Sequence, residues 1–136
     1  MSVCLCAVFN MHHDFSNSRC PCGDLCKNKK FQKAEYANCE AFYTGVKGWG
    51  LKASQDIIPG DFIMEYCGEV VNQADFTKRM EAYGKKRNRH YYFMTISKDE
   101  IIDAQIKGNL SRFINHSCEP NCETQKVTHI LSMCAH

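Results

Sequence analysis

Residues 111–122 read Ser-Arg-Phe-Ile-Asn-His-Ser-Cys-Glu-Pro-Asn-Cys. Asn115, His116 and Ser117 stand side by side, and short polar side chains compete with the backbone for hydrogen bonds inside a helix or strand. Pro120 then disfavours regular structure in the residues around it. The stretch is therefore predicted to be a loop that contacts a polar ligand, because binding residues concentrate on loops held by a rigid scaffold.

The composition is that of one globular domain. The chain has 136 residues, of which 44% are hydrophobic and 24% are charged, and its formal net charge is +2. That charge is too small to indicate nucleic-acid binding by itself. Ten cysteines with no recognisable secretory leader favour a reducing compartment with free or metal-bound thiols. No apolar run approaches membrane-spanning length, so no membrane partner is expected.

Residues 37–126 carry the alternation of a β-rich domain. Pro59 and Gly60 predict a type II turn that follows a strand ending at Ile57 and Ile58. The glycines on both sides of Trp49 predict a tight loop. Where β-branched and aromatic residues dominate, short strands are predicted at 40–43, 62–66, 69–71, 91–96 and 101–104.

One segment has the spacing of a helix. Phe76, Met80 and Tyr83 fall at i, i+4 and i+7, which places them on one face. Asn72 is a suitable N-cap and Gly84 is a suitable end. Many short strands and this single helix predict a mostly β fold of short twisted sheets with the helix against an edge.

Cys20, Cys22 and Cys26 form a C-x-C-x3-C motif. Three closely spaced thiols can face a single zinc ion, which prefers four such ligands. The alternative is three unligated thiols in a leader without regular structure. We expect at most one zinc ion at this motif. Its fourth ligand is left open among Cys4, Cys6, Cys39, His12 and His13.

Three further motifs have ordinary alternatives when taken singly. Trp49 is either a core residue or a stacking face beside backbone that a ligand can approach. Residues 90–94, His-Tyr-Tyr-Phe-Met, are in isolation a core strand. The basic residues of the 85–89 segment are either a solvated surface or a contact for DNA.

In this order, however, the motifs resemble the SET-domain histone-lysine methyltransferases, in the branch that carries a cysteine-rich AWS module in front. Residues 31–33 and 122–126 are most similar to enzymes that methylate lysine 36 of histone H3, with the plant-type branch preferred. The segments that carry the resemblance are Lys47-Gly-Trp-Gly, Glu65-Tyr-Cys-Gly-Glu, His90-Tyr-Tyr-Phe-Met, Ile102-Asp103-Ala104, Lys107-Gly-Asn and the run from Ser111 to Lys126.

The resemblance implies a SET fold and methyl transfer from S-adenosylmethionine to a lysine of histone H3 in the nucleus, on the chromosome. It implies histone H3 or the nucleosome as partner, and Arg112 as a brace for the loop that follows it. DNA contact is expected through Lys85, Lys86, Arg87 and Arg89. The implied channel for the substrate lysine is formed by Tyr91, Tyr92, Phe93 and Met94. The implied cofactor-binding residues are Lys47, Gly48, Trp49, His90, Tyr91, Tyr92, Asn115 and His116.

The resemblance also divides the chain. Residues 1–36 are expected to be a partial AWS-like module, 37–126 an incomplete SET domain and 127–136 an unrelated tail. The family's catalytic tyrosine and its post-SET cysteines have no counterpart, so we expect a truncated chain with doubtful activity. We also expect the strands at 62–66 and 91–96 to lack covering partners. The alternatives are a non-catalytic fragment that binds chromatin or a partner, and a zinc-finger-like module, although the cysteine region offers no base-reading helix.

Overall fold

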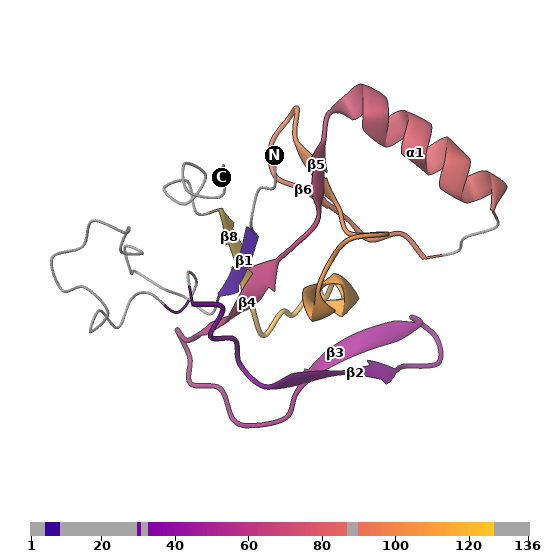
Figure 1. The fold of residues 1–136 in the computed structure, drawn as a ribbon. Helices are drawn as coiled ribbons and strands as arrows, with labels where there is room; N and C mark the ends of the chain where they lie inside the picture. Colours follow the sequence, from indigo (N-terminus) through magenta and orange to yellow (C-terminus); the bar gives the residue numbers. More distant parts are fainter. Residues whose placement is uncertain (1–4, 9–29, 31–32, 87–89, 127–136) are drawn as a thin grey trace, which may run out of the picture.

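The computed structural model describes residues 5–8, 30, 33–86 and 90–126. In these ranges small antiparallel sheets surround a shared core, and one α-helix, α1 (Gln73–Lys85), lies at the periphery (Figure 1). The predicted mostly β architecture with one helix is confirmed. The strands are β1 (Leu5–Val8), β2 (Cys39–Tyr43), β3 (Trp49–Ala53), β4 (Phe62–Tyr66), β5 (Glu69–Val71), β6 (Phe93–Thr95), β7 (Ile101–Asp103) and β8 (Glu123–Lys126), and a 3-10 helix, η3, spans Leu110–Phe113.

The hairpin of β2 and β3 presents Trp49. Tyr43 pairs with Trp49 in register, and the Thr44 backbone N–H closes the turn by donating to the Gly48 carbonyl at 2.7 Å. Gly45 and Gly48 have φ of 81° and 74°, values that glycine adopts without a steric cost. The predicted loop around Trp49 is thus wrong in its extent, because β3 begins at Trp49 itself and cross-strand pairing overrides the flanking glycines.

The segment between β3 and β4 contains the predicted type II turn. Gly60 has a φ of 95°, and the Asp61 backbone N–H donates to the Ile58 carbonyl at 3.0 Å. This is the geometry that a Pro-Gly pair favours at the centre of such a turn. The strand end expected at Ile57 and Ile58 is not formed, because no neighbouring strand pairs with these residues within the described part of the chain.

Helix α1 packs on the three-stranded sheet β5-β7-β6. Asn72 caps the helix, since its side chain accepts from the Asp75 backbone N–H at 2.9 Å. Tyr83 is buried, and the Phe76 ring meets Phe93 edge-on with centroids 4.9 Å apart, which confirms the predicted apolar face. Gly84 does not end the helix, which continues to Lys85 because the exposed Gly84 stays helical.

A buried carboxylate fastens the helix to this sheet. Asp103 on β7 is 1% exposed and accepts from Arg79 at 2.7 Å and from the Tyr83 hydroxyl at 3.0 Å. The Gln105 backbone N–H donates to its other oxygen at 2.9 Å. Arg79 also bonds Glu69 on β5 at 2.9 Å. One charged network therefore ties α1, β5 and β7 together, as a buried charge requires partners on all sides.

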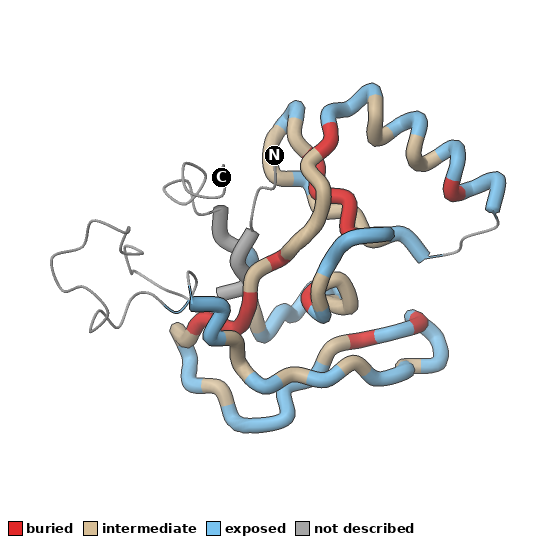
Figure 2. Tube along the Cα trace, viewed as in Figure 1, coloured by how far each residue is buried: buried red, intermediate tan, exposed pale blue. Residues whose placement is uncertain are grey.

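A second three-stranded sheet has the order β4-β1-β8. Leu5 pairs with Tyr66 on one side and with Lys126 on the other, and both ladders are antiparallel. The expectation that residues 62–66 lack a partner is therefore wrong, since β1 pairs along them. The other strand expected to lack a partner, β6, pairs with β7. Figure 2 shows the buried residues gathered along β4 and around β7.

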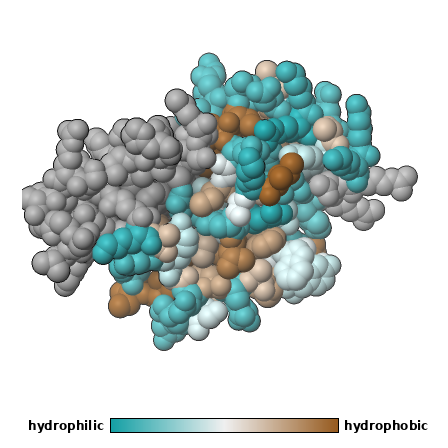
Figure 3. All heavy atoms as spheres, in the orientation of Figure 1, coloured by the Kyte–Doolittle hydropathy of each residue, from teal (hydrophilic) through white to brown (hydrophobic). Residues whose placement is uncertain are grey.

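The surface differs in character between α1 and the β2–β3 hairpin. In Figure 3 hydrophilic side chains predominate over α1, whereas more apolar residues gather around the β2–β3 hairpin. The large hydrophobic residues exposed on this hairpin and on the loop after it are Phe42, Tyr43, Val46, Trp49 and Ile58.

Candidate functional site

A cavity of about 260 Å³ lies where three segments meet: the β2–β3 turn, the residues before β6, and the end of η3. Three segments that lie far apart between positions 47 and 115 of the sequence thus line the same cavity. Most of the predicted cofactor-binding residues belong to it. Its lining is Lys47, Trp49, His90, Tyr91, Tyr92, Arg112, Phe113, Ile114 and Asn115.

Gly48 allows His90 to reach this cavity. A Cβ built on Gly48 would stand 2.7 Å from Cε1 of the His90 ring, a separation that real Cβ atoms do not show. The His90 ring therefore fills the space that a side chain at position 48 would occupy. Gly48 does not line the cavity itself, but its missing side chain and its positive φ shape one wall.

Asn115 connects the loop after η3 to the hairpin. Its side-chain amide donates to the Trp49 carbonyl at 3.1 Å, across 66 positions of sequence. The bond fixes the distance between the two cavity walls that carry Trp49 and Asn115. The loop predicted for residues 111–122 is confirmed for the Asn-His-Ser segment, since residues 114–117 have no regular structure, but it is wrong for residues 111–113, which form the end of η3.

An aromatic cluster forms the floor of the cavity. The Tyr92 and Phe113 rings meet edge-on with centroids 5.6 Å apart, and the Phe113 and Trp49 centroids are 6.1 Å apart. The Arg112 guanidinium carbon lies 4.3 Å from the Tyr92 centroid, within the range of a cation–π contact. Its Nε is buried and has no hydrogen-bond partner among the described residues.

Tyr66 lies behind the cluster, at the end of β4. Burial raises its pKa to about 12, although the nearby Arg112 acts in the opposite direction. The Tyr66 hydroxyl is therefore protonated at neutral pH and can donate a hydrogen bond. Phe113, Ile114 and Tyr66 were not among the predicted site residues. Tyr66 lies in the Glu65-Tyr-Cys-Gly-Glu motif, and Phe113 and Ile114 lie in the 111–122 stretch, but their apolar or aromatic character is that of ordinary core residues and does not single them out within those motifs.

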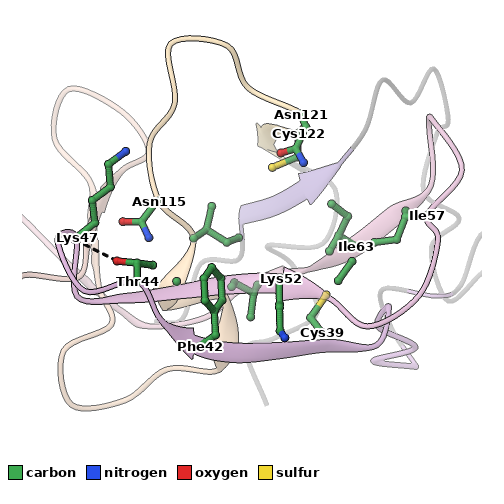
Figure 4. A pocket seen from close by; sticks show the side chains of 14 residues that line it. Cys39, Phe42, Thr44, Lys47, Lys52, Ile57, Ile63, Asn115, Asn121 and Cys122 are labelled. Atoms are coloured by element: carbon green, nitrogen blue, oxygen red, sulfur yellow. Dashed lines mark hydrogen bonds between the residues drawn. The ribbon is translucent and has the colours of Figure 1, made fainter.

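A second cavity of about 330 Å³ adjoins the first and shares Lys47, Ile114 and Asn115 with it. Figure 4 shows Asn121 and Cys122 on one side of it, and Phe42, Lys52 and Cys39 of the hairpin on the other. Burial raises the pKa of the Cys39 and Cys122 thiols, so both are protonated at neutral pH. These thiols are poor nucleophiles in this state.

Besides Gly48, three of the predicted site residues that the structure describes lie outside both cavity linings. His116 is exposed, with Nε2 4.0 Å from the Cys118 sulfur. Phe93 packs on Phe76 of the helix, and Met94 packs on the core cluster around Ile102. The roles predicted for them in the cofactor site and the lysine channel stay predictions.

The predicted metal and DNA contacts fall largely outside the described residues. The structure does not describe Cys20, Cys22 and Cys26, nor Arg87 and Arg89. Lys85 and Lys86 are exposed at the end of α1. Among the residues that the structure does describe, no group of three or more His, Cys, Asp or Glu could hold a metal ion, and no helix is long and apolar enough to cross a membrane.

Comparison with known proteins gives a consistent result. The family model of the SET domain matches residues 48–135, a range that runs past Lys126. The histone-lysine N-methyltransferase SETD2 of Homo sapiens is 54% identical over 112 residues, which are 82% of this chain and 4% of that protein. The histone-lysine N-methyltransferase ASHH2 of Arabidopsis thaliana is 51% identical over 107 residues, 79% of this chain and 6% of that protein.

A fungal relative adds the residue that is modified. The histone-lysine N-methyltransferase, H3 lysine-36 specific, of Aspergillus fumigatus is 50% identical over 107 residues, 79% of this chain and 11% of that protein. The chain thus spans only a small part of the length of the curated relatives that it matches. The identities to animal, plant and fungal relatives are similar, so the plant-type preference stays a prediction.

Proposed function

The chain belongs to the SET-domain family, and from this premise we propose that it carries the S-adenosylmethionine site of a methyltransferase that acts on lysine 36 of histone H3. The single observation that carries the proposal is the convergence of Lys47, Trp49, Tyr92 and Asn115, far apart in sequence, on one cavity. The names of the relatives supply the reaction and the histone lysine.

The residues of the cavity fit this cofactor chemically. S-adenosylmethionine carries a cationic sulfonium and an amino-acid carboxylate, and it supplies an electrophilic methyl group when it is bound. The aromatic faces of Trp49 and Tyr92 suit a cation. The Lys47 ammonium suits a carboxylate. Gly48 lets the backbone of the turn approach a ligand closely, because no side chain intervenes.

The protein's own part in transfer is positioning and desolvation. Arg112 under the Tyr92 ring and the Asn115–Trp49 bond hold the cavity walls in place before any ligand arrives. Aromatic side chains around a substrate lysine would exclude water and lower the pKa of its amine, which favours the neutral nucleophile. Tyr91, which is 41% exposed at the rim, and Tyr92 are the residues that we propose for this role.

Partners and location follow from the same function. We propose that the chain acts on histone H3 within the nucleosome, in the nucleus and on the chromosome. Lys85 and Lys86 are exposed and adjoin Arg87 and Arg89 in sequence, which gives a basic segment suited to DNA phosphates. One zinc ion at most is proposed for Cys20, Cys22 and Cys26, from their spacing.

Calorimetric titration with S-adenosylmethionine tests the site. Trp49→Ala removes a stacking face, and Asn115→Ala removes the bond to the Trp49 carbonyl, so each should weaken binding by tenfold or more. Tyr43→Ala is the matched control, because Tyr43 meets the Trp49 ring edge-on at 5.8 Å but does not line the cavity. Binding by both site variants with the parent's affinity would refute the site.

A radiolabel assay on nucleosomes tests the reaction. The proposal predicts that label from any transfer falls on histone H3 and is lost when lysine 36 of the histone is replaced by arginine. Label on the arginine-substituted histone would refute the assignment of the lysine. Binding of cofactor and nucleosome without any transfer would instead support the non-catalytic alternative.

A further inference from the structure

The most unusual feature outside the cavity is the position of β1 between β4 and β8, which we call the seat of β1. Within the described residues, β4 and β8 are not bonded to each other, and β1 is the strand that bonds to both (Figure 1). The three strands come from the beginning, middle and end of the described chain. The sheet therefore depends on a four-residue segment, Leu5–Val8, that lies between two strands distant from it in sequence.

The seat is defined by backbone geometry on both sides. Cys6 lies opposite Glu65 and Gln125, and Ala7 lies opposite Met64 and Thr124. The register shifts between Ala7 and Val8, so that Ile63 has no partner on β1. There the Ile63 carbonyl accepts from the Ala37 backbone N–H at 2.8 Å instead. The bulge fixes the register, since a slip would displace this bond.

The occupant matches the apolar character of β4, whereas β8 on its other side is the polar strand Glu-Thr-Gln-Lys. β4 is a core strand, with Phe62, Ile63, Met64 and Tyr66 all under 8% exposed. The occupant is Leu-Cys-Ala-Val, which has no charged or strongly polar residue. An open edge of such a strand is an aggregation site, whereas a strand that adds to it gains main-chain hydrogen bonds on both sides.

Apart from its hydrogen bonds to β4 and β8, β1 is connected to the rest of the domain only by the chain of residues 9–29 that follows it. About 20 residues can span at most roughly 70 Å, about twice the width of a small domain. A leader of that reach can fill the seat of its own chain or the seat of another. Main-chain ladders do not depend on which copy supplies the strand.

We propose that the gap between β4 and β8 is a strand-accepting site, and that its ligand is the apolar leader strand Leu5–Val8, which a second copy of the chain can supply in place of the chain's own. At low concentration the chain's own strand is favoured, because it is covalently attached to the acceptor and binding it needs no second chain. Exchange becomes more frequent when the chain's own strand is weakened.

Fluorescence polarisation with a labelled peptide of residues 1–9 tests the site on the full chain. Ala7→Pro in the chain removes a ladder hydrogen bond and weakens its own strand. The Ala7→Pro chain should bind the peptide at least tenfold more tightly than the parent chain does. A peptide that itself carries Ala7→Pro should bind at least tenfold more weakly. Equal binding by the two chains, or binding by neither, overturns the proposal.

Disulfide capture between two full chains gives a second test that does not need the proline variant. The acceptor chain carries Cys6→Ser and Glu65→Cys, and the donor is the parent chain with Cys6. Residues directly opposite in an antiparallel ladder are close enough to be bridged, so mass spectrometry should find a disulfide between donor Cys6 and acceptor position 65. The matched acceptor carries Cys6→Ser and Lys52→Cys, on the hairpin away from the seat. Equal capture by both acceptors overturns the exchange.

Discussion

The two three-stranded sheets of this domain are stabilised in different ways. The β5-β7-β6 sheet and α1 come from residues 69–103 and are joined by side chains, above all by the buried Asp103 network. The β4-β1-β8 sheet joins segments far apart in sequence, and main-chain ladders define it. A single side-chain change should therefore damage the first unit most, whereas the second should respond most to a change in the backbone, as in Ala7→Pro.

Asp103→Ala should have the largest effect of the side-chain changes. The substitution removes the carboxylate that accepts from the Tyr83 hydroxyl. It also removes one of the two carboxylates that Arg79 bonds, so that Glu69 is left as its partner. Because breaking a buried pair costs 3–5 kcal/mol and Arg79 is about a third exposed, we expect a loss of about 3 kcal/mol in the free energy of unfolding. Urea denaturation measures it.

Asp99→Ala is the control for Asp103→Ala. Asp99 is exposed in the loop between β6 and β7, so its removal should change the free energy of unfolding by less than about 0.5 kcal/mol. Similar losses for the two variants would mean that the buried network does not stabilise the first unit.

Gly68→Ala tests the junction between the two units, because Gly68 lies between β4 and β5. An added Cβ would stand 2.7 Å from the Asp103 carbonyl oxygen and would collide with the Ile102 side chain. Overpacking of this kind costs about 1–3 kcal/mol, and backbone cannot move aside cheaply. The change in melting temperature measures the loss.

Gly84→Ala is the opposite-sign control for Gly68→Ala. Gly84 lies within α1. A Cβ added there would have the Tyr91 hydroxyl oxygen as its nearest neighbour, at 3.8 Å. Alanine in a helix should therefore raise stability by about 0.5–1 kcal/mol. If Gly68→Ala were equally stabilising, β5 and β7 would not approach as closely as described.

Gly48→Ala separates backbone strain from a direct effect on the cavity. Gly45 and Gly48 both have positive φ, so alanine at either position should cost about 1–2 kcal/mol of stability. A Cβ at position 45 meets nothing within 4 Å, whereas one at position 48 collides with His90. Calorimetry should show cofactor affinity reduced tenfold or more in Gly48→Ala alone. Equal affinities in the two variants would show that the position of His90 does not matter for binding.

The difference between the two units also explains how much the sequence could predict. Asn72, the helical spacing that ends at Tyr83, and the Pro59-Gly60 turn are local signals, and the structure confirms each of them. The pairing of Leu5–Val8 with β4 leaves no such signal, because a short apolar run carries no record of its distant partner.

The cavity shows the same division between motifs and supporting residues. Lys47, Trp49 and Asn115 belong to motifs with unusual residue combinations, and the structure brings them together. Phe113 and Ile114 precede Asn115 in the same motif and line the same cavity, yet as apolar residues they are typical of any core. The Asn115–Trp49 bond is a tertiary contact that follows from the fold and not from either motif.

Glu69→Gln should have the smallest effect and tests the exposed rim of the first unit. Hydrogen bonds from Arg79 and Lys107 lower the pKa of Glu69 below its usual 4.5. Its ion pairs therefore stabilise the fold at pH values above the unfolded pKa, and this contribution is lost as pH falls through the folded pKa. At pH 7 the free energy of unfolding of the parent should exceed that of the variant by less than about 1 kcal/mol, which is typical of partly exposed ion pairs. Urea denaturation at pH 7 and at pH 3 should show the difference shrinking at the lower pH. A difference independent of pH would mean that the Glu69 side chain acts by packing, with no contribution from its charge.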